Sequence, residues 1–103
     1  MAAVPRSPLA SECESIFREA LAELSAARLV GEALREEEPP PGPLRVLALG
    51  KAAAPMAEAA LEALAGRAED ALCVLPDGQR PPAGVPWAAG SHPRPTARSL
   101  EAG

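Results

Sequence analysis

The fold is decided by residues 44–64, which read LRVLALGKAAAPMAEAALEAL. The stretch begins with a nearly continuous apolar run, Leu44 to Leu49, between Pro43 and Gly50. A short apolar run that is bounded by turn residues is typical of a strand that is buried on both faces. We therefore predict a strand over this run, at the centre of a parallel sheet.

The residues after this strand predict a helix and then a second strand. Apolar side chains recur at three- and four-residue steps from Met56 to Leu64, and Gly66 is a suitable helix end. Residues 71–75, which read ALCVL, form another short apolar run that stops at the turn residues 76–78. A strand, a helix and a strand in this order predict a Rossmann-like βαβ unit with parallel strands, so the fold class is α/β.

Upstream of the sheet, the sequence predicts one long amphipathic helix and a linker. Ser11 and Glu14 have the spacing of a capping box at a helix start. Apolar residues then recur at helical spacing to about Arg35, with Gly31 as a weak point. Residues 36–43 combine three acids, four prolines and a glycine, and such a segment cannot continue a helix.

The remaining residues complete one domain. A third short strand is predicted near residues 85–89, with Pro86 at its start or at an edge position. Because six of the thirteen prolines follow Leu75, we expect the last quarter of the chain to be mostly loop. We assign residues 1–43 to the N-terminal helix and linker, and residues 44–103 to a partial α/β domain, as two parts of the same domain.

Length and composition exclude several classes of protein. A chain of 103 residues has room for one modest core, and with only Phe17 and Trp87 as aromatic residues that core has to consist of Leu, Val and Ala. The formal net charge is −4, and no basic stripe offers a surface for nucleic acid. No segment approaches the roughly 18 apolar residues that a membrane span needs. Cys13 and Cys73 lack metal-binding spacing and lie among apolar neighbours, which predicts buried thiols in a reduced, cytoplasmic protein.

The turn after the first strand, GKAAA at residues 50–54, is the first candidate site. Open α/β sheets bind ligands at the carboxyl ends of their strands. Pro55 disfavours helical dihedrals at Ala54, so the helix is predicted to begin near Pro55 and to leave backbone N–H groups for an anion. Lys51 is the only lysine beside nine arginines, which indicates a place where a compact ammonium is needed. The alternative is a solvated lysine, because the spacing fits neither a dinucleotide fingerprint nor a Walker A loop.

The second candidate is GSHPRP at residues 90–95, which holds the only histidine. A neutral imidazole both donates and accepts hydrogen bonds, so His92 is able to bind a substrate oxygen or to order a loop over the site. The alternative is a rigid surface turn fixed by Pro93 and Pro95. We favour this alternative on the residues alone, because no acid, cysteine or second histidine lies nearby in the sequence as a catalytic partner.

Taken together, LALGKAAAPMA at residues 47–57 and SHPRP at residues 91–95, with a helix and a strand between them, resemble the N-terminal domain of the glycerate 2-kinases. These proteins are also called MOFRL-type kinases or hydroxypyruvate reductase-like proteins. The family shows an amphipathic helix, a strand that ends in Gly-Lys-Ala with a methionine shortly after, and a later Gly-His-Pro-x-Pro-Asp segment. Ser91 and Thr96 depart from this pattern, at the positions of its glycine and its aspartate.

The resemblance implies ATP-dependent phosphorylation of D-glycerate at its 2-hydroxyl, with Mg²⁺ accompanying the nucleotide. Lys51 matches the family's active-site lysine, which implies that it pairs with the glycerate carboxylate or with the transferring phosphoryl group. Gly50 would allow close approach of the backbone, Ala52 completes the Gly-Lys-Ala motif, and His92 matches the histidine of the His-Pro motif. The implied substrate-binding residues are thus Gly50, Lys51, Ala52 and His92, with Lys51 catalytic and no recognisable set of metal ligands.

The family continues beyond the matched motifs with a glycine-rich segment, more sheet and a second domain. We therefore expect the chain to be the N-terminal portion of such a kinase, inactive without a missing C-terminal domain or partner chain. One alternative is a small module that binds phosphate or nucleotide without catalysis, which anion binding by a stable monomer would favour. Another is an interaction protein that pairs its open sheet edge with a second chain, which a stoichiometric partner would favour.

Overall fold

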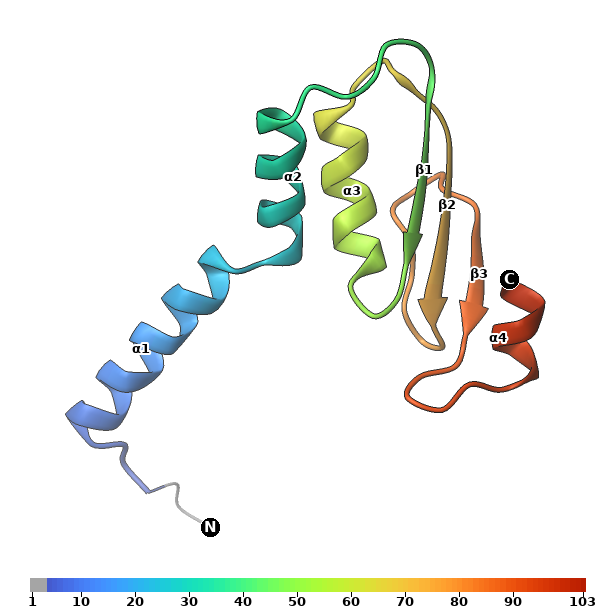
Figure 1. Ribbon diagram of the computed structural model, residues 1–103. Helices are drawn as coiled ribbons and strands as arrows, with labels where there is room; N and C mark the ends of the chain where they lie inside the picture. Colours follow the sequence, from blue (N-terminus) through green and yellow to red (C-terminus); the bar gives the residue numbers. More distant parts are fainter. Residues whose placement is uncertain (1–3) are drawn as a thin grey trace.

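The computed structural model describes residues 4–103 and confirms the α/β fold class (Figure 1). Three parallel strands within the described residues form a sheet in the order β1-β2-β3, with a helix between the first two strands. The elements are α1 (Pro8–Glu23), α2 (Ala26–Glu36), β1 (Leu44–Leu49), α3 (Ala53–Ala63), β2 (Ala68–Pro76), β3 (Trp87–Gly90) and α4 (Ala97–Ala102).

The first predicted strand is parallel, as expected, but its central position was wrong. β2 lies between β1 and β3, and β1 is an edge of the sheet within residues 4–103. The side chains of Leu47 and Leu49 are 64% and 62% exposed, so β1 is covered on one face only. Their register partners on β2 are Leu72 and Val74, and Leu72 is also 39% exposed. One face of the sheet is therefore apolar and open.

The core lies on the other face and is built from small side chains. Ala53 and Ala57 of α3 are buried against β1 and β2, where Ala48, Cys73 and Leu75 complete the cluster. Alanines on the contact face allow the helix to lie close to the sheet, and α2 in turn packs on α3. The sequence has two aromatic residues, and neither belongs to this core, since Phe17 is 62% exposed and Trp87 is 50% exposed. The core therefore consists of small and aliphatic side chains, as the composition predicts.

The N-terminal region forms two helices, and the predicted single helix was wrong. Ser7 caps α1, which begins at Pro8 rather than at the predicted capping box around Ser11. Ser25 interrupts the run and caps α2, because its side chain accepts a hydrogen bond from the N–H of Arg28 at 3.2 Å. Helix α2 continues through Gly31, which is buried.

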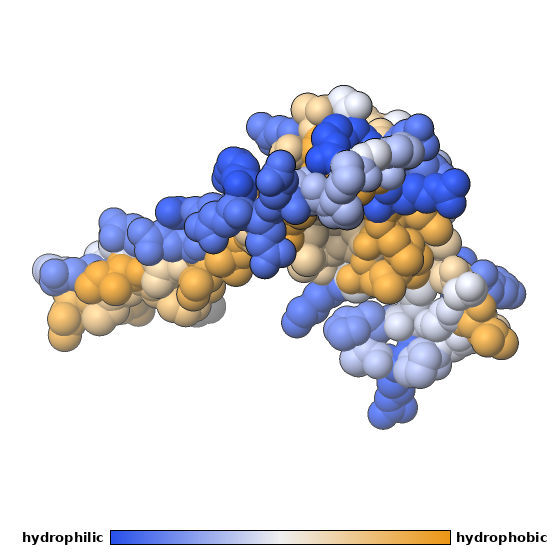
Figure 2. All heavy atoms as spheres, turned by 45° about the horizontal axis from the view of Figure 1, so that its top comes forward, coloured by the Kyte–Doolittle hydropathy of each residue, from blue (hydrophilic) through white to orange (hydrophobic). Residues whose placement is uncertain are grey.

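Helix α1 projects from the body of the molecule (Figure 1). It has no buried residue, and its apolar residues lie along one side, which is visible in Figure 2 as a band on the projecting helix. The radius of gyration is 18.0 Å, against about 13 Å for a compact chain of this length. Within residues 4–103, no helix is both long enough and apolar enough to cross a bilayer.

The C-terminal quarter is mostly loop, as predicted, and it also contains one helix that was not predicted. The linker before β1 and the third strand are confirmed, since residues 37–43 form no helix and β3 begins at Trp87. Helix α4 was missed; Thr96 caps it in a reciprocal arrangement with Ser99. The connection from β2 to β3, residues 77–86, is an extended proline-containing loop in place of a crossover helix.

The two cysteines differ, and the prediction of two buried thiols was wrong for one of them. Cys13 is exposed on α1, whereas Cys73 is fully buried at the centre of the core. Burial raises the pKa of the Cys73 thiol, because the thiolate would lose its hydration. The Cys73 side chain therefore acts as a neutral, small apolar group in the folded protein.

We expect iodoacetamide to alkylate Cys13 in the native protein and to leave Cys73 unmodified, since alkylation requires an accessible thiolate. Peptide mass spectrometry before and after unfolding in urea measures both sites. The pKa of Cys73 is higher in the folded protein than in the unfolded chain. The neutral thiol therefore contributes fully to stability below the pKa of the unfolded chain, and this contribution is lost as the pH rises through the pKa of the folded protein. The stability of the wild type should therefore fall above about pH 8.5, more than that of Cys73→Ala. Equal alkylation of both native thiols would contradict the burial of Cys73.

Candidate functional site

The carboxyl ends of the three strands meet at one edge of the sheet, and a small pocket lies there. Its volume is about 200 Å³. The residues that line it come from the turn after β1, from the end of β2, from the end of β3 and the loop that follows it, and from α4: Gly50, Lys51, Val74, Leu75, Pro76, Gly90, Ser91, His92 and Ser99. This volume lies below the roughly 300–1,000 Å³ of pockets for drug-sized ligands, so the pocket suits a small molecule.

Gly50 makes the turn between β1 and the pocket possible. Its φ is +105°, a region that residues with a Cβ rarely adopt. Its N–H donates to the carbonyl of Val74 at 3.0 Å, and its own carbonyl accepts from the N–H of Ala53 at 3.1 Å. A Cβ at this position would meet no atom within 4 Å, so the backbone conformation requires the glycine, and close packing does not.

We expect Gly50→Ala to lower the free energy of unfolding by about 1–3 kcal/mol, because alanine is strained at this φ. The matched control is Gly31→Ala, which places a Cβ at 3.2 Å from the flexible guanidinium of Arg35 in a regular helix. That change should be neutral or stabilising by up to about 1 kcal/mol. Urea denaturation measures both variants, and a smaller loss for Gly50→Ala than for Gly31→Ala would contradict the assignment.

Lys51 lies between this glycine and the start of α3. The helix begins at Ala53, so the predicted start near Pro55 was wrong. Proline fits in the first turn, where its missing N–H has no helical partner. Ala52 is the N-cap and no side chain caps the helix.

A lysine at the positive end of a helix is unfavourable unless an anion binds there. The ammonium of Lys51 forms no ion pair with any carboxylate of residues 4–103.

His92 is presented by a loop that hydroxyl groups hold in place. The hydroxyl of Ser99 accepts hydrogen bonds from the N–H of Ser91 at 3.0 Å and from the N–H of Thr96 at 3.4 Å. The hydroxyls of Ser91 and Thr96 also bond to each other. Ser91 and Thr96, the two residues that depart from the Gly-His-Pro-x-Pro-Asp pattern of the glycerate 2-kinases, are therefore in direct contact. The peptide bond between His92 and Pro93 is cis.

An ion pair joins the end of β2 to α4. The guanidinium of Arg98 bonds to the carboxylate of Asp77, directly after the strand. Both side chains are more than half exposed, so the pair contributes at most about 1 kcal/mol to stability. Its position matters more than its energy, since it ties α4 to β2 while Ser99 ties the same helix to the loop after β3.

The structure thus brings three of the four predicted site residues together. Gly50, Lys51 and His92 line the same pocket, although they follow two strands that do not touch each other. Ala52 does not line it. Ser91 and Ser99 were missed; the spacing of Thr96 and Ser99, which is that of a helix cap, was the available signal. In the part of the chain that the structure describes, no three His, Cys, Asp or Glu residues come close enough to hold a metal ion. The roles of these residues in binding or catalysis stay predictions.

The comparison with known sequence families decides the family of the chain. Residues 12–103 match the family described as "Domain of unknown function (DUF4147)". The chain belongs to this family. The DUF4147 match takes in all three strands and every residue that lines the pocket. No curated protein matches the chain, and no solved structure matches it.

Proposed function

We propose that the chain is the N-terminal domain of a glycerate 2-kinase-like enzyme, and that the pocket at the carboxyl ends of the strands binds D-glycerate. The DUF4147 domain is found in glycerate kinase-like, MOFRL-associated proteins, which supports this assignment at the level of the family. The reaction would transfer the terminal phosphoryl group of ATP to the 2-hydroxyl of D-glycerate.

The observation that carries the proposal is the meeting of Lys51 and His92 in one pocket. An unpaired ammonium is suited to a carboxylate, and an imidazole is suited to a hydroxyl group as donor or acceptor. D-glycerate offers one carboxylate and two hydroxyls on three carbons, and the pocket volume of about 200 Å³ accommodates a molecule of that size. Lys51 is equally able to stabilise the transferring phosphoryl group, because phosphoryl transfer depends on positioning and on charge stabilisation.

The described residues do not by themselves fit the nucleotide phosphates and Mg²⁺ at this pocket. No group of His, Cys, Asp or Glu side chains within residues 4–103 could hold a metal ion. The pocket is also too small for a nucleoside triphosphate. We therefore limit the role of this pocket to the small substrate. The metal ligands of the proposed enzyme would come from another domain or chain.

The open apolar face of the sheet supports a further part of the proposal. Leu47, Leu49 and Leu72 lie side by side on β1 and β2 and are all exposed. Exposed apolar patches of this kind mark surfaces that other protein parts cover. We propose that a second domain or a partner chain packs here in the working enzyme. Two free thiols suit a reducing compartment, and we propose the cytoplasm as its location.

Titration with D-glycerate, followed by the amide signals in nuclear magnetic resonance spectra, tests the proposal. We expect saturable shifts that are confined to the turn at Gly50–Ala52 and to the loop at Ser91–His92, because both line or flank the pocket. L-lactate, which has a carboxylate but no 3-hydroxyl, is the matched control and should bind more weakly. Shifts at neither segment would reject the substrate site.

Inorganic phosphate separates this function from the alternative of a binding module without catalysis. Lys51 has no carboxylate partner among the described residues and precedes a helix that no side chain caps. This arrangement favours anions in general and is the observation behind that alternative. If phosphate shifts the same amides at lower concentration than D-glycerate does, the module without catalysis is the better account. Tighter binding of D-glycerate favours the kinase.

A further inference from the structure

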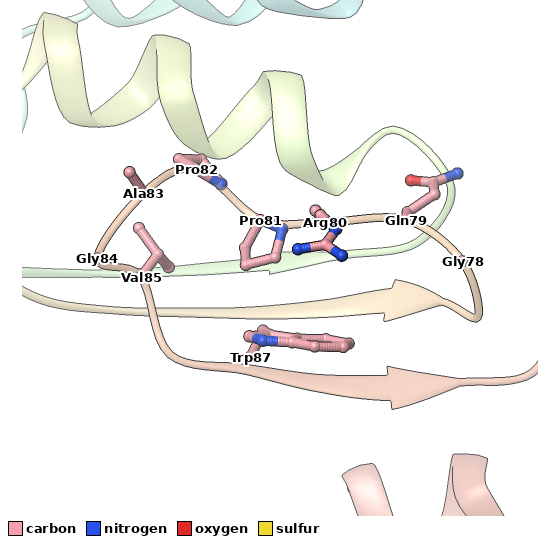
Figure 3. Close-up of a pocket in the computed structure, with 9 residues that line it drawn as sticks. All are labelled: Gly78, Gln79, Arg80, Pro81, Pro82, Ala83, Gly84, Val85 and Trp87. Atoms are coloured by element: carbon pink, nitrogen blue, oxygen red, sulfur yellow. The ribbon is translucent and has the colours of Figure 1, made fainter.

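The loop that connects β2 to β3 encloses a second hollow, distinct from the Lys51 pocket. Its volume is about 550 Å³, and it shares no lining residue with the first pocket. Figure 3 shows the residues that line it: Gly78, Gln79, Arg80, Pro81, Pro82, Ala83, Gly84, Val85 and Trp87. Nothing in the proposed binding of D-glycerate uses these residues.

Trp87 supplies an aromatic face to this hollow. It is the first residue of β3, and its register partner Cys73 is fully buried, yet the tryptophan is 50% exposed. An indole is the largest apolar side chain and contributes most when its faces are covered. In Figure 3 the ring is seen edge-on, with one flat face toward Pro81 and the guanidinium of Arg80. Because half of the side chain is exposed and it lines the hollow, a flat ligand in the hollow is able to contact the ring.

Arg80 supplies a cation on the opposite side of the hollow. Its guanidinium forms no ion pair and no hydrogen bond with any residue in the described range 4–103. Two prolines follow it directly, and Gly78 and Gly84 turn the loop at φ values of +87° and +78°. The two prolines restrict the backbone directly after Arg80, and the exposed guanidinium is accessible to a ligand in the hollow.

We propose that this hollow binds a nucleoside phosphate, with the base stacked on Trp87 and the phosphate held by Arg80. The two groups together select the ligand class. An indole face favours flat aromatic rings, and a guanidinium without a carboxylate partner favours phosphate through paired N–H donors. The site is independent of the Lys51 pocket; the extension that its ligand is the phosphoryl donor rests on the proposed function.

The fluorescence of Trp87 tests this site directly. The sequence has one tryptophan and no tyrosine, so emission excited at the red edge of indole absorption comes from Trp87 alone. We expect AMP to quench it with a saturable curve, because a stacked base contacts the indole. Adenosine and ribose 5-phosphate should each bind at least about tenfold more weakly, since each lacks one of the two contacts.

Variants of two arginines complete the test. Arg80→Gln should weaken the affinity for AMP at least about tenfold and leave the extent of quenching at saturation unchanged. Arg94→Gln, at an exposed position that lines neither pocket, should leave the affinity unchanged. Circular dichroism checks that both variants are folded. Absence of saturable quenching, equal affinity for AMP and ribose 5-phosphate, or an unaffected Arg80→Gln variant would each overturn the proposal.

Lys51→Ala separates this inference from the proposed function. The variant should bind D-glycerate more weakly and keep the quenching by AMP, because Lys51 does not line the hollow. If D-glycerate binds to the wild type and AMP does not quench Trp87, the nucleotide site falls and the substrate site stands. If AMP quenches Trp87 and D-glycerate shifts no amide signal, the substrate site is rejected and the nucleotide site is supported.

Discussion

Lys51→Ala is expected to weaken the binding of D-glycerate by about 10- to 150-fold, which corresponds to the roughly 1.5–3 kcal/mol of a hydrogen bond to a charged group. The reason is that Lys51 is the only basic residue that lines the pocket besides the imidazole of His92, and it has no carboxylate partner within residues 4–103. Isothermal titration calorimetry measures the affinity. The folded structure should be unaffected, since the side chain is exposed.

Two further variants make this prediction specific. Lys51→Arg keeps the charge but places a wide planar group in a pocket of about 200 Å³, so its affinity should lie between those of the wild type and the alanine variant. Arg94→Ala removes a cation from the same loop as His92 without touching the pocket, and should bind like the wild type. Equal losses in Lys51→Ala and Arg94→Ala would show a general effect of charge and would contradict a site at Lys51.

Leu75→Ala is expected to lower the free energy of unfolding by about 2–5 kcal/mol, the usual range for removing a buried leucine side chain. Leu75 is 1% exposed and is the largest side chain that the core buries completely, so its neighbours, which are mostly alanines, cannot fill the space. In a chain whose total stability is limited by a thin core, this loss is large enough to populate the unfolded state. Urea denaturation, followed by circular dichroism, measures the change.

Leu47→Ala is the control for this variant. The same side chain is removed from the neighbouring strand, but Leu47 is exposed on the open face, and the expected change is within about 0.5 kcal/mol. If both variants lose equal stability, the open face is covered in solution, and the assignment of the core to the α3 side alone is incorrect.

The elements of the sheet could be predicted from the sequence because their signals are local. The run Leu44–Leu49 and the run around Cys73 are apolar, short and bounded by turn residues, and both are strands. The position of β1 at the edge could not be predicted in this way. Strand order depends on which strands pair, and an apolar run has the same appearance at the edge as at the centre when one apolar face stays open.

The N-terminal helices show how a local signal is missed. Ser25 lies within a continuous helical periodicity, directly after the C-cap of α1, and its hydroxyl caps the start of α2. A serine in that context is ambiguous, because the same residue also occurs inside helices. Ser11 had the stronger pattern, a serine followed by a glutamate three residues later, but Ser7 and Pro8 upstream provided a cap and a first helical residue.

The candidate site could be predicted only in part, because local signals identified single residues and not their arrangement in space. Position after a strand pointed to Lys51, and the resemblance pointed to His92, but only the parallel arrangement of β1, β2 and β3 brings both to one edge. The hydroxyl of Ser99 had only the helix-cap spacing with Thr96 as a signal, and Ser91 had none. The hollow at Trp87 and Arg80 was not predicted, because it forms only when an extended loop takes the place of a crossover helix.

A phosphorylation assay on the protein as its organism produces it tests the proposed kinase function. Purified protein is incubated with ATP, Mg²⁺ and D-glycerate, and phosphorus magnetic resonance identifies the product. We expect 2-phosphoglycerate from the wild type and none above background from Lys51→Ala. Formation of 3-phosphoglycerate, equal turnover by Lys51→Ala, or no phosphorylated product from the wild type would contradict the proposed function.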